Sequence, residues 1–360
     1  MTLRETSERR TLRAPVTCPF QDALALRLAR DFTGKQREDL AAATAAWPHA
    51  ELAAHVESLV ATHLGVRPRR TLFVKKSVGV VFGLELVDGS SVVLKFFPPT
   101  LTLTQLHGVL RCLQQLERAH FPVTPSVSPP FVTAFETLGC FFAYASGEVR
   151  TGHEPNVRRE LASRLAEFTS LVTAINPAEL PAAPGHHAQL WPPSPRSYLR
   201  FDARRDLAWL DTIAAQAQGV LEASTLPELP AHMDWGTKNA RFVGDRVAAL
   251  FDWDSLCRAS EAEMVGRAAA QFTAQWDVPA AVVPSAVEAQ SFVEDYEDAA
   301  GRRFSPEEWP VLIAAAQYVT ATIARVEAAH PAPPRDGFLD RLRSLNGSPL
   351  LTGGPAREAP

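Results

Sequence analysis

The sequence predicts an α+β protein of two lobes, in which a small lobe built on an antiparallel sheet precedes a larger, mostly helical lobe. Three observations support this fold class. Strand-like runs occupy residues 70–76, 78–87 and 91–97 and recur at 131–135 and 140–145. Residues 155–174, 206–223 and nearly all of the chain beyond 255 show the helical spacing of apolar residues instead. The pattern changes at Ser146-Gly147, which marks the predicted lobe boundary.

The chain therefore divides into four predicted segments. Residues 1–64 form a frayed arm and a helical extension, and residues 65–145 form the small lobe, called the N-lobe here. Residues 146–345 form the helical lobe, called the C-lobe, with strands only near 240–253. Residues 346–360, rich in Gly, Pro and small side chains, are predicted to be a disordered tail.

Composition excludes several classes of function. The chain has 360 residues, 46% of them hydrophobic and 21% charged, and its net charge is −4. We expect no nucleic-acid partner because no basic run is present. We expect no membrane partner because no run of 18 apolar residues occurs and the N-terminus lacks the apolar core of a signal peptide. The four cysteines are scattered, which fits a reducing compartment and predicts a cytoplasmic protein.

The predicted N-lobe carries a lysine in an unusual setting. Asp88-Gly89 predicts a hairpin turn before the strand at 91–97. Within that strand, alternation places Lys95 on the same face as Val93 and Phe97, so a solvated and an inward-facing lysine remain equally open. Upstream, the run KKSVGVVFG contains Ser77 and is consistent either with a loop over phosphates or with an ordinary hairpin. The leucines of residues 103–116 recur at helical intervals and predict one helix packed on this sheet.

Two short polar runs in the C-lobe carry the strongest chemical signal. HMDWGTKN spans residues 232–239, and LFDWDSL spans residues 250–256. Gly244-Asp245 predicts a turn between them, so a hairpin would bring Asp252 back beside Asp234 and Asn239. Magnesium prefers oxygen ligands, and a carboxylate with one amide is a plausible protein contribution. The other carboxylate can accept a proton from an attacking hydroxyl. The alternative interpretation is a polar loop beside a strand.

The order of these features resembles the aminoglycoside phosphotransferase family, within the protein-kinase-like fold that also includes choline and fructosamine kinases. The residues that carry the resemblance are His232, Asp234, Asn239 and Asp252, with Lys95 in support, and it spans roughly residues 70–330. The two-part motif, in this order and with Asp252 eighteen residues after Asp234, is specific.

The resemblance implies a role for each of these positions. Asp234 resembles the catalytic base, and Asn239 and Asp252 resemble the ligands of the Mg²⁺ that bridges the ATP phosphates. Lys95 resembles the lysine that holds the phosphates of ATP. His232 resembles a structural residue that braces the backbone near the metal-binding Asp. The nucleotide would also contact Ser77 and the hinge at 142–146, which includes Tyr144.

One departure from the family concerns the partner of Lys95. The family usually places a Glu on the N-lobe helix to pair with the strand lysine. Here no acidic residue lies between Asp88 and Glu117, and Gln105 or His107 sits nearer the expected place. A neutral partner would hold Lys95 less firmly, because the charge-assisted hydrogen bonds are lost, and this would lower the catalytic rate.

Two further charged residues accompany the motif. Asp254 is expected to support the site, either as a further metal ligand or as an acid of the substrate pocket. Lys238 could contact the transferred phosphate or could simply face solvent. Trp253, between the two aspartates, should face the core.

The acceptor is the least determined part of the function. A cationic acceptor would need carboxylates, which residues 292–301 and the pair Glu261 and Glu263 offer, although such runs are normally solvated helix faces. Trp276 and Tyr296 could stack on a sugar or an amine, but both are better explained as core.

The predicted function is transfer of the γ-phosphate of ATP, with Mg²⁺, to a hydroxyl of an aminoglycoside-like compound, an amino alcohol or a sugar. The alternative is a kinase-like nucleotide-binding protein with weak or no turnover. A solvent-facing Lys95, or an acceptor pocket filled by Trp235, would favour that alternative.

Overall fold

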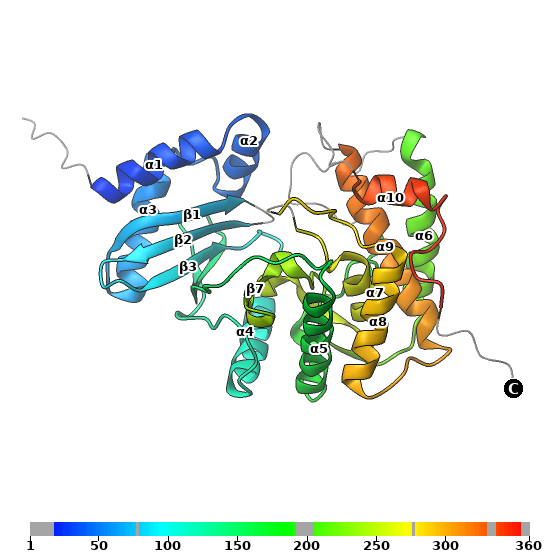
Figure 1. Ribbon diagram of the computed structural model, residues 1–360. Helices are drawn as coiled ribbons and strands as arrows, with labels where there is room; N and C mark the ends of the chain where they lie inside the picture. The colour runs from blue at the N-terminus through cyan, green and yellow to red at the C-terminus, as the bar shows by residue number, and fades with distance from the viewer. Residues whose placement is uncertain (1–17, 77–78, 192–204, 276–277, 330–335, 354–360) are drawn as a thin grey trace, which may run out of the picture.

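The computed structural model describes residues 18–76, 79–191, 205–275, 278–329 and 336–353, and these form two lobes (Figure 1). A five-stranded sheet with helices α1–α3 makes the N-lobe, and helices with two small sheets make the C-lobe. The predicted α+β class and bilobal arrangement are confirmed.

The N-lobe sheet is antiparallel throughout. Its strands lie in the order β1-β2-β3-β5-β4, so β3, which carries Lys95, is central. The predicted turn at Asp88-Gly89 is present, because Gly89 adopts a φ of 86° and its N–H bonds the Leu86 carbonyl at 3.1 Å. The predicted strand at 131–135 shortens to two residues. The bounds are β1 Pro68–Lys76, β2 Val80–Leu86, β3 Ser91–Phe96, β4 Phe131–Val132 and β5 Leu138–Ala143.

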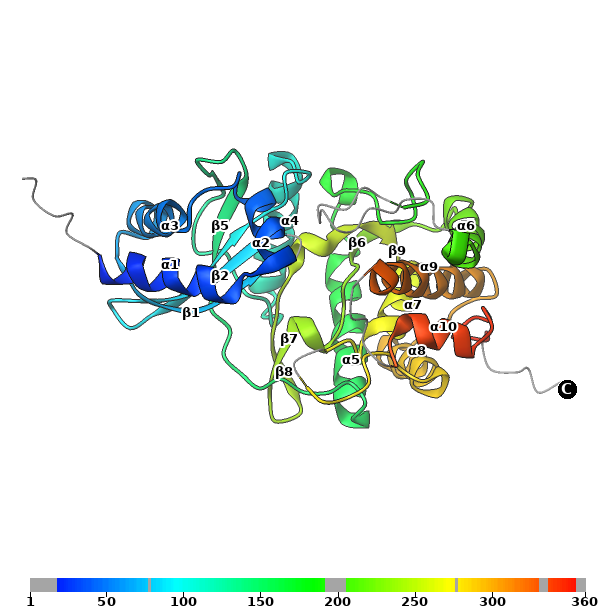
Figure 2. The same cartoon turned by 90° about the horizontal axis from the view of Figure 1, so that it is seen from above.

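The N-terminal extension covers one face of this sheet. It consists of α1 (Pro19–Asp31), α2 (Gly34–Ala43) and α3 (His49–Leu64), which lie along the sheet in Figure 2. The even-numbered side chains of β3 point toward it and form one hydrophobic cluster with α1 and α3. Lys95 belongs to the opposite face, because side chains alternate along a strand. The extension therefore fixes which face of β3 is left for chemistry.

Helix α4 (Leu103–Arg118) packs between the N-lobe sheet and the C-lobe. The sequence predicts one helix packed on the N-lobe sheet, and the buried side chains of α4 join a core that the C-lobe mostly forms. Phe97 and Cys140 belong to the same core, and Leu138 and Phe142 of β5 pack against it. The helix therefore lies on the side of the sheet that the extension leaves free. The leucine stripe of α4 therefore meets the C-lobe, in which its nearest helix is α5.

The C-lobe is a helical core with one very close contact. Helices α7 and α9 meet so tightly at Gly266 that a Cβ there would lie 2.1 Å from the Leu312 carbonyl oxygen. Helix α9 has the length and composition of a membrane span, but 67% of that window is buried, as in the core helix of many soluble proteins. The bounds are α5 Pro155–Val172, α6 Ala208–Glu222, α7 Glu261–Gln271, α8 Ala286–Ala300, α9 Glu308–Ala329 and α10 Phe338–Ser344.

Two small sheets form the part of the C-lobe that faces the N-lobe. In one sheet β6 (Glu228–His232) pairs with β9 (Leu256–Ser260), and in the other β7 (Ala240–Val243) pairs with β8 (Arg246–Leu250). The β7–β8 hairpin is confirmed. Strand β9 corrects the prediction of helices alone beyond residue 255. The spacing of apolar residues cannot distinguish a strand from a helix in a run of only five residues. Short 3₁₀ turns lie between these elements of the C-lobe. Their bounds are η1 Pro177–Glu179, η2 Arg205–Leu207, η3 Thr237–Asn239 and η4 Trp253–Ser255.

The predicted disordered tail does not begin at residue 346. Leu350 and Leu351 are buried in the C-lobe core, so residues 346–353 are held by apolar packing. Composition alone missed this contact because two leucines are enough to anchor a segment rich in Gly and Pro. The rest of the predicted tail, residues 354–360, lies outside the described residues.

Candidate active site

The hairpin β7–β8 brings the two polar runs together. Asn239 precedes β7, and Phe251 follows β8. The Phe251 N–H donates to the Asn239 carbonyl at 3.0 Å, which extends the pairing of Ala240 with Leu250. Gly244 makes the turn with a φ of 57°, a conformation that glycine adopts without strain. Asp252 therefore returns to the level of Asn239, as the sequence predicts.

Asp234 accepts contacts from two side chains of its own loop. Its Oδ1 lies 2.6 Å from the Lys238 ammonium, and its Oδ2 accepts a hydrogen bond of 2.9 Å from the Asn239 amide. The same amide group donates to the Asp234 carbonyl at 2.8 Å. The Asp234 side chain is 27% exposed, so it remains open to an incoming group. Lys238 is thus not the solvent-facing lysine that was the simpler expectation.

His232 ties the two loops to each other. Its Nδ1 accepts the Asp234 N–H at 3.3 Å, and its Nε2 lies 3.3 Å from the carbonyl of Phe251, the residue before Asp252. Burial lowers the pKa of His232, which favours the neutral ring. A neutral ring that accepts at Nδ1 must carry its proton on Nε2, so it donates to Phe251. One imidazole therefore spans the backbone beside both aspartates.

Lys95 lies buried between two carboxylates of the other lobe. Its ammonium donates to Asp252 and to Asp254, and its side chain is only 9% exposed. Burial alone would lower the pKa of Lys95, but the two carboxylates outweigh it and hold the pKa above its ordinary value. Burial likewise opposes ionisation of Asp252, yet the ion pair with Lys95 keeps the pKa of that carboxyl well below its usual range. Lys95 is charged, and it bridges β3 to η4.

The oxygens around Asp252 fit a divalent cation. Asn239 uses its amide nitrogen on Asp234, which leaves its Oδ1 as the atom available for a cation. Asp252 is 31% exposed and adopts a φ of 68°, a left-handed conformation that costs a residue other than glycine of order 1 kcal/mol. In the described residues no cluster of three His, Cys, Asp or Glu side chains forms a ready-made metal site. The donor set is thus carboxylate plus amide, which suits a cation that keeps its waters and binds phosphate oxygens.

Both tryptophans of the motif are buried in the core and do not face the polar side chains of the candidate site. Trp235 is 1% exposed and donates to the Leu161 carbonyl at 3.1 Å. Trp253 is 3% exposed and donates to the Leu250 carbonyl at 2.9 Å. Lys95 is buried and paired, and Trp235 does not fill an acceptor pocket. Neither condition that would favour the binding-only alternative is met.

The predicted nucleotide contacts are only partly described. Ser77 lies outside the described residues. Gly79, which follows it, approaches β3 so closely that a Cβ would lie 2.0 Å from the Phe96 carbonyl oxygen. Tyr144, just after β5, is 41% exposed, with its ring 6.4 Å from that of Phe73. Gly79 therefore lies directly against the strand that carries Lys95.

Five of the six acidic residues considered for the acceptor are already engaged, and Glu294 accepts only a long hydrogen bond of 3.4 Å from Gln290. Glu261 bonds the Tyr296 hydroxyl and Arg302, and Glu263 accepts from His186 at 2.8 Å. Tyr296 is buried in the core, as expected. In the run 292–301, the ion pairs are Asp295 with Arg158 and both Glu297 and Asp298 with Arg303. These carboxylates stabilise the C-lobe, and Trp276 lies outside the described residues.

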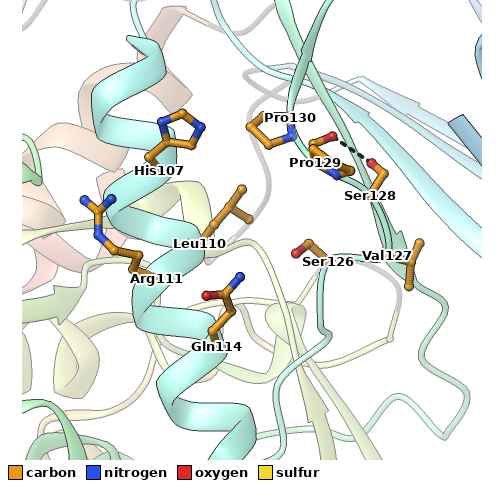
Figure 3. Close-up of a pocket in the computed structure, with 9 residues that line it drawn as sticks. All are labelled: His107, Leu110, Arg111, Gln114, Ser126, Val127, Ser128, Pro129 and Pro130. Carbon is orange, nitrogen blue, oxygen red and sulfur yellow. Dashed lines mark hydrogen bonds between the residues drawn. The ribbon is translucent and has the colours of Figure 1, made fainter.

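A separate cavity of about 480 Å³ lies between α4 and residues 126–130 (Figure 3). His107, Arg111 and Gln114 line it from the helix, facing Ser126 and Ser128. None of the predicted site residues lines it. Its chief consequence for the site is that His107, one candidate partner for Lys95, points into this cavity.

Known phosphotransferases are similar to this chain in sequence pattern and fold. The model of the phosphotransferase enzyme family, APH, matches residues 81–312. None of the curated proteins searched matches the sequence. Among solved structures, the amicoumacin kinase hAmiN, in complex with AMP-PNP, Ca²⁺ and Ami, superposes with a TM-score of 0.64 at 14% identity. That match covers 84% of this chain and 97% of hAmiN.

Two further structures are similar at a lower level. Spectinomycin phosphotransferase APH(9)-Ia, in complex with ADP and spectinomycin, has a TM-score of 0.48 at 12% identity, covering 82% of this chain and 92% of that chain. Ethanolamine kinase from Plasmodium vivax has a TM-score of 0.46 at 13% identity, covering 76% and 80%. The family match spans more than half of the chain, and hAmiN shares its fold. The chain belongs to the aminoglycoside phosphotransferase family and is a small-molecule phosphotransferase.

Proposed function

We propose that this protein transfers the γ-phosphoryl group of ATP, with Mg²⁺, to a hydroxyl group of a small molecule. The observation that carries the proposal is the meeting of Lys95 from the N-lobe with Asp252 from the C-lobe, one hairpin away from Asp234 and Asn239. Phosphoryl transfer needs positioning and charge neutralisation more than covalent chemistry. A lysine, an exposed carboxylate base and a carboxylate–amide pair supply both.

Each residue has one task in the proposed reaction. Asp234 orients the acceptor hydroxyl through its exposed carboxylate and takes up the proton as the bond to phosphorus forms. The acceptor oxygen bonds the γ-phosphorus, the bond from that phosphorus to the bridging oxygen breaks, and ADP leaves. Lys95 pairs with the phosphates on the nucleotide side. His232 keeps the backbone of both loops in place throughout.

Asn239 and Asp252 would hold the divalent cation. When bound, that cation neutralises charge on the phosphate oxygens. We propose magnesium because Asn239 and Asp252 would supply few oxygen donors, and magnesium usually keeps several waters and binds phosphate oxygens. The complex of hAmiN with AMP-PNP and Ca²⁺ supports a nucleotide and a divalent ion in this fold.

The acceptor is proposed only as a hydroxyl-bearing small molecule. Aminoglycoside-like compounds, amino alcohols and sugars all remain candidates. Most of the C-lobe carboxylates in the described residues are already paired. They therefore give no reason to prefer a cationic acceptor over a neutral one. The binding-only alternative would rest on the missing helix acid, but the burial and pairing of Lys95 weigh against it.

A two-stage experiment tests the proposal. A ligand that binds the folded state alone raises apparent stability, so thermal shift with ATP should rise further with MgCl₂. ATP consumption is then screened over aminoglycosides, amino alcohols and sugars. Asp234→Asn should retain the Mg-ATP shift and lose turnover, whereas Asp252→Asn should weaken the shift itself. Turnover by Asp234→Asn equal to that of the parent, or no shift with Mg-ATP, would overturn the proposal.

A further inference from the structure

We propose that Asp254 is the positioning residue for Lys95, in the place that a carboxylate of the N-lobe helix usually takes. The inference rests on the proposed function, because it assumes that Lys95 contacts the phosphates. It concerns how the C-lobe, rather than α4, keeps that lysine ready. Three features of the structure support it.

The first feature is that two carboxylates pair with Lys95 and differ in their exposure to solvent. Lys95 donates to both Asp252 and Asp254. The Asp254 side chain is 13% exposed, whereas that of Asp252 is 31% exposed. Asp252 is therefore the more accessible of the two to a cation, and Asp254 is the more enclosed with the lysine. When Asp252 turns to a divalent cation, Asp254 remains as the counter-ion of Lys95.

The second feature is that α4 has nothing to offer Lys95. Its single acid, Glu117, is exposed near the end of the helix. Gln105, one of the two nearer candidates, is committed to a capping box in which its side chain accepts from the Thr102 N–H at 2.9 Å. His107 lines the helix side of the cavity that separates α4 from residues 126–130. The buried face of α4 is apolar.

The third feature is physical necessity. Removing every partner from a buried ammonium costs several kcal/mol, so a lysine this enclosed requires a standing carboxylate. Asp254 sits in η4, between Trp253, which is anchored in the core, and Ser255, whose N–H bonds the Asp252 carbonyl at 3.2 Å. The counter-ion thus comes from a rigid turn. The position of Lys95 is then set without any movement of α4.

The test is a double-mutant cycle with Asp254→Asn, Lys95→Met and the double variant. The cycle is first measured as urea unfolding without nucleotide, which reports the pair whatever the protein catalyses. A positioning role predicts strong coupling, because Asp254→Asn loses its cost once the ammonium is gone. Additive effects would overturn the pairing. Asp254→Glu is the conservative variant and keeps a carboxylate if Asp254→Asn folds poorly.

The cycle is then measured as the apparent affinity and KM for Mg-ATP. Asp254→Asn should raise KM for ATP by about tenfold or more, with half-saturation by MgCl₂ unchanged, and should add less than about threefold in the Lys95→Met background. Asp254→Glu should recover part of the loss. Two results would overturn the inference. If Asp254→Asn raises KM equally in the parent and in the Lys95→Met background, Asp254 does not act through Lys95. If half-saturation by MgCl₂ shifts, Asp254 acts as a metal ligand instead. A parent that binds no Mg-ATP defeats the proposed function, while the unfolding cycle still decides the pairing.

Discussion

Replacing His232 with Ala should disconnect the loop of Asp234, the proposed catalytic base, from the loop of Asp252, the proposed metal ligand. The ring is 1% exposed and packs edge-on against the rings of Trp253 and Trp235, at 4.9 and 5.6 Å. Its hydrogen bonds to the Asp234 N–H and to the Phe251 carbonyl contribute about 1 kcal/mol each, and the ring also contacts the Ser255 hydroxyl at 3.2 Å. The cavity left by the ring adds at least about 1 kcal/mol. We expect a loss of about 3 kcal/mol in the free energy of unfolding.

The same substitution should lower turnover, because both aspartates lose their shared backbone support. The measurement is urea unfolding alongside ATP consumption with any acceptor found. His107→Ala is the matched control, since that side chain is exposed and makes none of these bonds; it should change stability by less than about 0.5 kcal/mol. If His232→Ala unfolds like the parent, the hydrogen bonds do not hold the loops. If it loses stability but keeps full turnover, the support is not needed for catalysis.

Three other predictions concern Lys238, the contact between α7 and α9, and the pH dependence of stability. Lys238→Ala removes a cation 2.6 Å from the Asp234 carboxylate, the proposed catalytic base. Steady-state kinetics should then show kcat lower by about tenfold with KM for ATP nearly unchanged, and an unchanged kcat would show that Lys238 has no part in the transfer. Gly266→Ala should lower the free energy of unfolding in urea by about 2 kcal/mol or more. The control Gly219→Ala, also within a helix but with open space at its Cβ, should raise it by up to about 1 kcal/mol. Equal effects of the two substitutions would contradict the close contact of α7 with α9. The hydrogen bond to Glu263 raises the pKa of His186 above its ordinary value, so this pair stabilises fully below about pH 6.5 and less as pH rises through the raised pKa. Unfolding measured from pH 6 to 8.5 should show the parent losing its advantage over His186→Gln, and a constant difference would contradict the assignment.

Much of the site could be predicted because its chemistry is local in sequence. Asp234 and Asn239 are five residues apart on one loop, and a single turn at Gly244 returns Asp252 to them. A hairpin of this length leaves little choice of register. The same locality explains why the hairpin was predicted, whereas β9, whose partner β6 lies far back along the chain, was not.

The partner of Lys95 could not be predicted, because it depends on how the lobes meet. Lys95 and Asp254 are separated by 159 residues. The sequence shows that α4 lacks an acid, but it does not show that η4 would supply one. Likewise, the leucines of α4 predict an apolar helix face without saying which lobe receives it. The extension α1–α3 occupies the outer face of the sheet, so only the face that carries Lys95 is left for α4 and the C-lobe.

The run Asp-Trp-Asp is best understood as one structural unit. Trp253 lies in the core, with its ring 5.8 Å from that of Phe168, and its indole N–H bonds the last residue of β8. Because that middle residue is anchored inward, the aspartates on either side of it both reach Lys95. The left-handed backbone at Asp252 is the local cost of this arrangement. A buried tryptophan thereby couples the packing of the C-lobe to the position of both carboxylates. Under the proposed function, a substitution that loosens the core at Trp253 should therefore weaken Mg-ATP binding before it unfolds the protein.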